Sequence, residues 1–196
     1  MQGEGKRTFC GIVHWISFFS ARVVVMCSKI EAKKTSFGNN FWVDLALKCP
    51  IFTDGSKCSS CTSFACVFIN STLSFQLHPS CSIFTAEITA ILQALSQIFS
   101  GPPDDYIIYS DSLSALESMT SLNRFSHPFT FKILELHDRL TTKGFTIPFC
   151  WIPSHVGISG NELADNLARS ATNSLNSPAP MNEVKKYVKS ILHSKW

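Results

Sequence analysis

The spacing of apolar residues divides the chain after about residue 49 into short strands and longer helices. Runs rich in aromatic and β-branched residues predict the strands, and apolar residues at helical spacing predict the helices between them. The expected strands are 50–56, 64–70, 73–78, 105–110 and 145–152, and the expected helices are 84–99, 112–121, 128–142 and 160–173. This order predicts an α/β fold with a mixed five-stranded sheet and helices on both faces.

Two acidic residues stand out against this pattern. Glu87 falls on the apolar stripe of the helix expected at 84–99. An unpaired carboxylate on that face is costly to bury, and a bound metal ion would remove the cost. Asp54 ends the first apolar strand, directly before Gly55. Taken alone, Asp-Gly is a common turn dipeptide, so a hairpin turn would also explain Asp54.

Two further acids follow in the second half. Asp111 comes after the apolar run 106–109, which is typical of a strand buried on both faces, although Asp111 would also suit a helix N-cap. The segment 151–165 ends a strand, crosses a loop with His155, and starts a helix in which Asn161 and Asp165 share a face. Four acids at strand ends and inner helix faces together indicate a carboxylate cluster for hard divalent cations.

The order of these motifs is similar to that of type I ribonuclease H. The motifs are TDGS from Thr53, AEITAILQAL from Ala86, YSDSLSAL from Tyr109 and WIPSHVGISGNELADNLA from Trp151. The resemblance covers about residues 50–172, and SHVGISGNE most resembles the ribonuclease H domains encoded by non-long-terminal-repeat retrotransposons of arthropods and other animals. It implies a ribonuclease H-like fold and an endonuclease that hydrolyses the RNA strand of RNA/DNA hybrids, with no small-molecule substrate.

Matched position by position, the family's metal-binding carboxylates fall on Asp54, Glu87, Asp111 and Asp165, and its catalytic-loop histidine falls on His155. The resemblance implies two Mg²⁺ ions, with Mn²⁺ as the alternative. Asp54 would bridge both ions. Glu87 and Asp111 would hold the ion near the leaving 3′ oxygen, and Asp165 the ion that carries the attacking water. His155 would relay protons or help product leave.

Substrate contacts are expected at Gly55, Ser56 and Asn161. Contacts to 2′-hydroxyl groups across the wide minor groove would tell RNA from DNA. Residues 1–48 carry a net charge of +4 and residues 49–196 a net charge of −1. A near-neutral domain must bind nucleic acid through metal ions and a few placed donors, so we expect weak hybrid affinity. The short segment 124–128 predicts that the basic protrusion of some family members is absent.

The chain is expected to divide into an extension at 1–48, a ribonuclease H domain at 49–174, and a linker with a basic tail at 175–196. Phe9 to Ser28 is apolar enough to suggest a signal peptide or membrane segment, but His14 and Arg22 interrupt it. Each uninterrupted piece is shorter than the roughly 20 residues that a membrane span requires. A poorly structured extension, or a remnant of sequence upstream of the retrotransposon's domain, is therefore favoured, and the tail is expected to end as a loosely attached helix.

Eight cysteines raise the question of a metal knuckle. Cys58 and Cys61 have its two-residue spacing, and Cys66 and Cys81 follow. No second pair and no histidine has matching spacing, so free thiols are the simpler interpretation. Free thiols favour a reducing compartment, the cytoplasm or the nucleus.

Three other interpretations fit part of this pattern of acids. A phosphate-accepting receiver domain would need a parallel sheet, which the meander after Asp54 disfavours. Transposases and integrases use three acids and a different closing helix, so the helix that carries Asn161 and Asp165 separates them from this chain. A catalytically inactive, nucleic-acid-binding remnant is the alternative that stays open. The complete set of four acids argues against it, and a measurement of activity decides.

Overall fold

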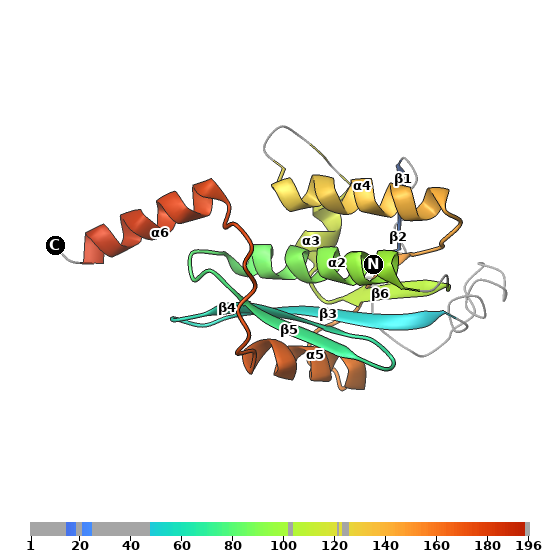
Figure 1. Ribbon diagram of the computed structural model, residues 1–196, viewed down its shortest axis with the longest axis horizontal. Coiled ribbons are helices and arrows are strands. Elements are labelled where there is room, and N and C mark those ends of the chain that lie inside the picture. Colours follow the sequence, from blue (N-terminus) through green and yellow to red (C-terminus); the bar gives the residue numbers. More distant parts are fainter. Residues whose placement is uncertain are drawn as a thin grey trace, which may run out of the picture.

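The structure is a computed structural model, and it describes residues 48–101, 104–120, 122 and 126–194 together with the backbone of 15–18 and 21–24. A twisted sheet lies at its centre, with helices above and below (Figure 1). The order of elements expected from the sequence is confirmed between residues 49 and 169.

The sheet begins with an antiparallel meander of three strands, β3 (Cys49–Lys57), β4 (Thr62–Val67) and β5 (Thr72–Leu77). β6 (Tyr106–Ser110) then pairs parallel to β3, and β7 (Phe149–Trp151) pairs parallel to β6. These five strands form the expected mixed sheet, in the order β7-β6-β3-β4-β5. The parallel pair β3–β6 lies in its middle, where both faces are covered.

Two short strands extend the sheet beyond β7. β1 (Trp15–Phe18) and β2 (Ala21–Val24) form an antiparallel pair, and β2 pairs parallel to β7, so that the described sheet has seven strands. The expectation of a poorly structured extension is therefore wrong for these two segments. The remainder of 1–47, including most of the apolar run 9–28, lies outside the described residues, as do residues 123–125 of the segment expected to lack a protrusion.

Helices cover both faces of the sheet. On one face lie α2 (Ile83–Ser100), α3 (Leu113–Ser118) and α4 (Pro128–Thr142), and α5 (Ser159–Arg169) covers the other (Figure 1). The apolar stripe of α2 packs on β3 and β4, which gives the core its centre at Phe64, Ile88 and Ile91. Among the described residues, α2 is the one helix long and apolar enough to cross a membrane, but 56% of it is buried within the protein.

β7 and α5 are shorter than the sequence pattern predicts. β7 starts at Phe149 rather than at 145, because Pro148 has no N–H to donate, although its carbonyl still accepts from Ile108 N at 3.0 Å. α5 ends at Arg169 rather than at 173. The chain leaves the helix there because Asn173 O pairs with Gln76 N of the edge strand β5, at 2.6 Å. A final helix, α6 (Met181–Ser194), follows and projects from the body (Figure 1).

Candidate active site

Asp54 and Asp111 lie side by side on the two central parallel strands. β3 and β6 pair with Thr53 opposite Ser110, so the next residue of each chain brings its carboxylate to the same level. Asp54 is buried and Asp111 is half-buried. The indole N–H of Trp151, on β7, donates to the carbonyl oxygen of Asp111 at 3.0 Å and fixes the chain after β6.

Glu87 joins these two acids from α2, which crosses β3 at very short range. Gly55 makes that approach possible, because a Cβ at residue 55 would lie 2.8 Å from the backbone nitrogen of Glu87 and 3.0 Å from its Cδ. Glu87 is 7% exposed. One carboxylate oxygen from each of Asp54, Glu87 and Asp111 lies within 4.8 Å of the others. Three acids distant in sequence therefore converge on one point.

Two oxygens in this group are buried without a hydrogen-bond partner. They are Oδ2 of Asp54 and Oε2 of Glu87. Leaving such an atom unpaired in the interior costs about 1–3 kcal/mol, and more for a charged group. Hard divalent cations bind carboxylate oxygens, so a cation at this point would satisfy both atoms. The donor set therefore fits a divalent metal ion.

Burial and mutual repulsion raise the pKa of both buried acids. Burial is the largest cause for Asp54, and the charges of Asp111 and Asp165 add to it, which raises the pKa from 3.8 to about 8. Burial also raises the pKa of Glu87 well above its usual value, with the charge of Asp54 as the next cause. A hydrogen bond from the N–H of Gly55 offsets part of each rise.

This raised pKa predicts an unusual pH dependence for the metal-free protein. Between about pH 4 and pH 8 the folded chain holds a proton on Asp54 that the unfolded chain has released, so this group lowers stability as pH rises through that window. In EDTA, the melting temperature of wild type should fall with pH more steeply than that of Asp54→Asn, measured by thermal melts from pH 4 to 9. Parallel curves of melting temperature against pH for the two proteins would contradict the raised pKa of Asp54.

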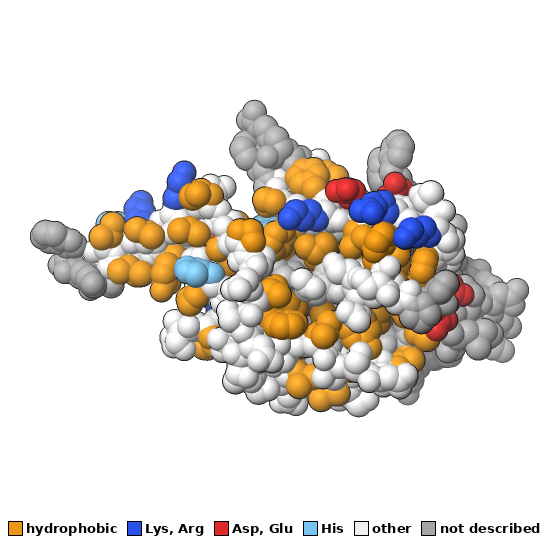
Figure 2. All heavy atoms as spheres, viewed as in Figure 1, with side chains coloured by type: hydrophobic (Ala, Val, Ile, Leu, Met, Phe, Trp, Pro, Cys, Tyr) orange, Lys and Arg blue, Asp and Glu red, His pale blue; other side chains and the backbone are white. Residues whose placement is uncertain are grey.

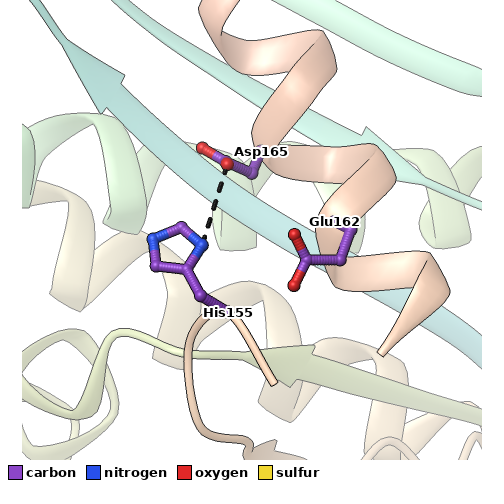
Figure 3. Close-up of side chains that lie close together, drawn as sticks. All are labelled: His155, Glu162 and Asp165. Carbon is purple, nitrogen blue, oxygen red and sulfur yellow. Dashed lines mark ion pairs between the residues drawn. The ribbon is translucent and has the colours of Figure 1, made fainter. Parts of the chain in front are cut away.

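His155, Glu162 and Asp165 form a second group of possible metal ligands (Figure 3). One possible ligand atom from each lies within 4.8 Å of the others. Nδ1 of His155 is 4.0 Å from Oδ2 of Asp165, and Oε1 of Glu162 accepts a hydrogen bond from Gly157 N at 3.3 Å, which ties the loop to α5. His155 has φ 53°, in the left-handed region, which costs an L-residue roughly 1–2 kcal/mol. The loop holds the imidazole toward Asp165 in spite of this strain.

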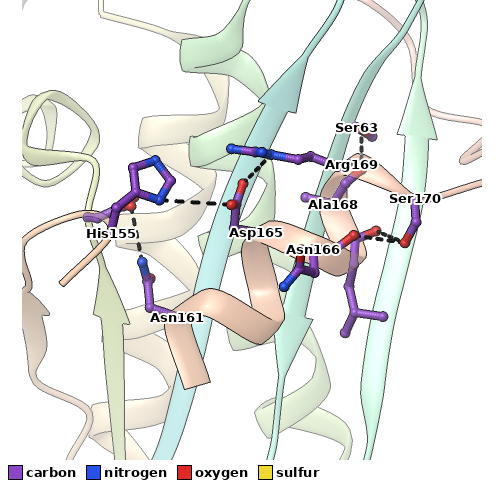
Figure 4. A network of polar contacts seen from close by, with 10 residues as sticks. Ser63, His155, Asn161, Asp165, Asn166, Ala168, Arg169 and Ser170 are labelled. Carbon is purple, nitrogen blue, oxygen red and sulfur yellow. Dashed lines mark hydrogen bonds and ion pairs between the residues drawn. The ribbon is translucent and has the colours of Figure 1, made fainter. Parts of the chain in front are cut away.

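Two neighbours on α5 orient the acids (Figure 4). Arg169, one turn after Asp165, donates from Nε to Oδ1 of Asp165 at 2.7 Å, so Asp165 lies between His155 and Arg169. Asn161 is 2% exposed and donates from Nδ2 to Oδ2 of Asp111 at 3.2 Å. Asn161, expected from the sequence to contact substrate, therefore contacts Asp111 and has one further atom, Oδ1, that is buried without a partner.

All five residues expected to be catalytic, with Gly55 and Ser56, line one open cleft of about 580 Å³. The sequence prediction thus names residues that the fold brings together. It did not include Glu162 and Arg169. The spacing of Asp165 and Arg169, four residues apart on a helix, is a sequence signal for their ion pair. Glu162 ends the SHVGISGNE motif, but helical periodicity alone does not distinguish it from other polar helix residues.

The cysteines do not form a metal knuckle in the described part of the chain. Neither group of residues suited to a metal ion contains a cysteine. Cys58 and Cys61 lie at the turn between β3 and β4, whereas Cys66 is buried and donates from Sγ to Ala90 O at 3.2 Å. The six described cysteines are free thiols.

Comparison with protein families places most of the described chain in a known family. A family model described as RNase H matches residues 47–173, the part of the chain that holds the sheet from β3 to β7, the helices from α2 to α5 and every acid of the cleft. A search of curated proteins finds no significant match. Members of the RNase H family generally use divalent metal ions, in agreement with the donor set above. Because the match covers more than half of the 196 residues, the chain belongs to the RNase H family.

Proposed function

We propose that this protein is a ribonuclease H, an endonuclease that hydrolyses the RNA strand of RNA/DNA hybrids with the help of divalent cations. The observation that carries the proposal is the pair of buried, unpartnered oxygens, Oδ2 of Asp54 and Oε2 of Glu87, at the floor of an open cleft. Burying these two oxygens without a partner is costly when no cation is bound, and a bound cation would remove that cost. The family match supports the substrate class.

The cation set that suits these residues is two Mg²⁺ ions, with Mn²⁺ as the alternative. Asp54, Glu87, Asp111 and Asp165 would hold them. When bound, such cations lower the pKa of a coordinated water and stabilise charge on the transferring phosphoryl group. Asn161 positions Asp111 through its amide, and Arg169 fixes the orientation of Asp165 through their ion pair. These two residues act through the acids rather than on the substrate.

His155 is the group in the cleft best suited to move a proton. An imidazole can accept a proton on one ring nitrogen while the other donates one, and His155 is exposed on a loop over Asp165. Gly55 and Ser56 line the cleft beside the acids, and their backbone groups could read the 2′-hydroxyls of RNA.

The origin and cellular site of the protein are part of the proposal. The SHVGISGNE segment, Ser154 to Glu162, supports derivation from a non-long-terminal-repeat retrotransposon. Free thiols at the six described cysteines are consistent with a reducing compartment, the cytoplasm or the nucleus.

The decisive experiment is cleavage of an end-labelled RNA/DNA hybrid by the purified full chain with Mg²⁺. Duplex DNA and duplex RNA of the same sequence serve as substrate controls, and EDTA serves as the metal control. Asp54→Asn, purified in parallel, reports any nuclease carried over from the expression host. Cleavage of the RNA strand of the hybrid, and of neither control duplex, is the expected result. Hybrid binding without cleavage would instead support the inactive remnant.

His155→Ala should slow turnover without abolishing it. A positioned proton carrier typically contributes about 10²- to 10⁴-fold, and solvent can replace part of that at an exposed position, so we expect a loss of kcat near the lower end of this range. Mg²⁺ affinity, measured by calorimetric titration, should barely change. Loss of all activity together with loss of Mg²⁺ binding would make His155 a metal ligand and would reject its role as a proton carrier.

A further inference from the structure

α6 is attached to the domain through one carboxylate in its first turn. Glu183 reaches the N-terminus of α2, where its Oε2 accepts a hydrogen bond from Ser82 N at 3.2 Å. Its Oε1 accepts from the hydroxyl of Thr85 at 2.8 Å and also from the hydroxyl of Ser82. Three donors at a helix N-terminus thus converge on one anion. Ser82 and Thr85 supply these donors, and His127 contacts the hydroxyl of Thr85 from behind. We call these three residues the anion cradle.

The hydrogen bonds behind the cradle turn its hydroxyl hydrogens toward the anion. Nδ1 of His127 accepts from Phe129 N at 3.2 Å, so the ring proton is on Nε2, which lies 3.2 Å from the hydroxyl oxygen of Thr85 and donates to it. The hydroxyl oxygen of Ser82 accepts from Thr85 N at 3.1 Å, as an N-cap does. Both hydroxyl oxygens already accept, and their own hydrogens are therefore available to Glu183.

The rest of α6 has few contacts with the domain. The ring of Tyr187 meets that of His78 edge-on, with centroids 6.1 Å apart. Met181, Val188 and Leu192 are 67%, 48% and 57% exposed. Figure 2 shows α6 as a projection with apolar side chains along its length and lysines at its upper edge. Such a helix can leave the domain at little cost in buried apolar surface, so the Glu183 contact is its main polar attachment.

The cradle borders the cleft. Ile83 and Phe84, the two residues after Ser82, line the same cleft as the four acids. The ring of Phe84 meets that of His127 with centroids 5.7 Å apart. A nucleic acid that lies in the cleft and extends along the start of α2 would bring a backbone phosphate to the cradle. Glu183 is then in the position of that phosphate.

We propose that α6 is an autoinhibitory latch: Glu183 and a backbone phosphate of the nucleic acid compete for the anion cradle, and binding of the hybrid displaces α6. The inference rests on the proposed function for the identity of the nucleic acid. A phosphate offers more acceptor oxygens than a carboxylate to the same donors. A long hybrid also gains contacts in the cleft that Glu183 lacks, and the hybrid therefore wins at saturation.

The test compares Glu183→Ala with Glu135→Ala in the full chain. Glu135 is an exposed acid on α4, so the control makes the same change in net charge. Binding of a fluorescent RNA/DNA hybrid is measured by anisotropy in EDTA, which excludes cleavage. Because the lost contact is a charge-assisted one, Glu183→Ala should bind the hybrid about 10-fold more tightly than wild type. Glu135→Ala should match wild type to within about twofold.

Competition between inorganic phosphate and the hybrid provides a second test. In Glu183→Ala the open cradle should accept phosphate, which would then weaken hybrid binding more than an equal ionic strength of chloride does. Adding Thr85→Val, which removes one hydroxyl donor and keeps the shape, should cancel the gain in hybrid affinity. With Mg²⁺, KM should fall in Glu183→Ala and kcat should stay unchanged, because saturating hybrid has already displaced α6.

Three outcomes would overturn the latch. Unchanged hybrid affinity in Glu183→Ala, with a lower melting temperature, would make Glu183 a structural cap of α2 only. Weaker affinity would mean that α6 helps to bind the nucleic acid, for example through Lys185 and Lys189. A gain in hybrid affinity equal to that of Glu135→Ala would mean that the change in net charge alone causes it. If the hybrid binds more tightly but no protein cleaves it, the latch holds and the proposed nuclease activity fails.

Discussion

Asp54→Asn is expected to lower Mg²⁺-dependent cleavage of the hybrid by at least about three orders of magnitude while leaving the fold intact. That loss corresponds to about 4 kcal/mol in the activation barrier. Asp54 is one of the two buried acids of the cluster: the charges of Asp111 and Asp165 both raise its pKa, and one of its oxygens is buried without a partner. An amide at this position keeps the shape but binds a hard cation weakly and removes one negative charge.

The same substitution should raise the melting temperature of the metal-free protein. We expect this rise because the substitution relieves repulsion. At pH 8 the wild-type protein must either ionise Asp54 beside its acidic neighbours or keep Asp54 protonated, and asparagine requires neither. Asp105→Asn is the matched control, because Asp105 directly precedes β6, at the opposite end of that strand from Asp111, and forms an ion pair with Lys48 at 3.8 Å. The control should retain full activity. Wild-type activity in purified Asp54→Asn would reject the proposed metal site.

Much of this site could be predicted from the sequence because its acids break a strong local pattern. Asp54 and Asp111 each follow an apolar strand, and Glu87 sits on the apolar stripe of a helix, where a carboxylate needs an explanation. Local periodicity also gave α4 its bounds, 128–142, because Pro128 begins the helix and its stripe at Ile133, His137 and Leu140 is regular.

What could not be predicted depends on contacts between distant segments. The hydrogen bond between Glu183 and Ser82 joins residues 101 positions apart, and no local pattern indicates it. The early end of α5 depends on pairing with Gln76, since the Ala/Leu stripe alone continues to Ala171. The hydrogen bond from Asn161 to Asp111 is a further case, because a sequence says which face of a helix a residue occupies but not that Asp111 lies opposite. Tertiary packing decides each of these cases.

The strands of the sheet also divide into those that a local sequence pattern predicts and those that it does not. The meander and the two later strands follow from runs of β-branched and aromatic residues, which are local signals. The pairing of β2 with β7 has no such signal, because the run 9–28, apolar except for a few residues such as His14 and Arg22, suits several structures equally. Parallel pairing of this kind depends on where β7 lies, which is a property of the whole fold.

Glu87→Gln should separate a metal ligand from a structural acid. We expect loss of cleavage by at least about 10³-fold and loss of Mg²⁺ affinity in calorimetric titration, because one oxygen of Glu87 is buried without a partner beside Asp54 and Asp111. The melting temperature without metal should not fall. Burial raises the pKa of Glu87 well above its usual value, so the folded state gains nothing from its negative charge and the neutral amide is the easier group to bury.

At pH 8 we therefore expect Glu87→Gln to melt above metal-free wild type, by about 2–4 °C for each 1 kcal/mol of relieved charge burial. Mg²⁺ should raise the melting temperature of wild type and leave that of the variant unchanged. Glu117→Gln, an exposed acid on α3, is the matched control and should behave as wild type in both measurements. A marked destabilisation of Glu87→Gln with Mg²⁺ affinity intact would mean that Glu87 holds the helix to the sheet, and the cation would then have to bind without it.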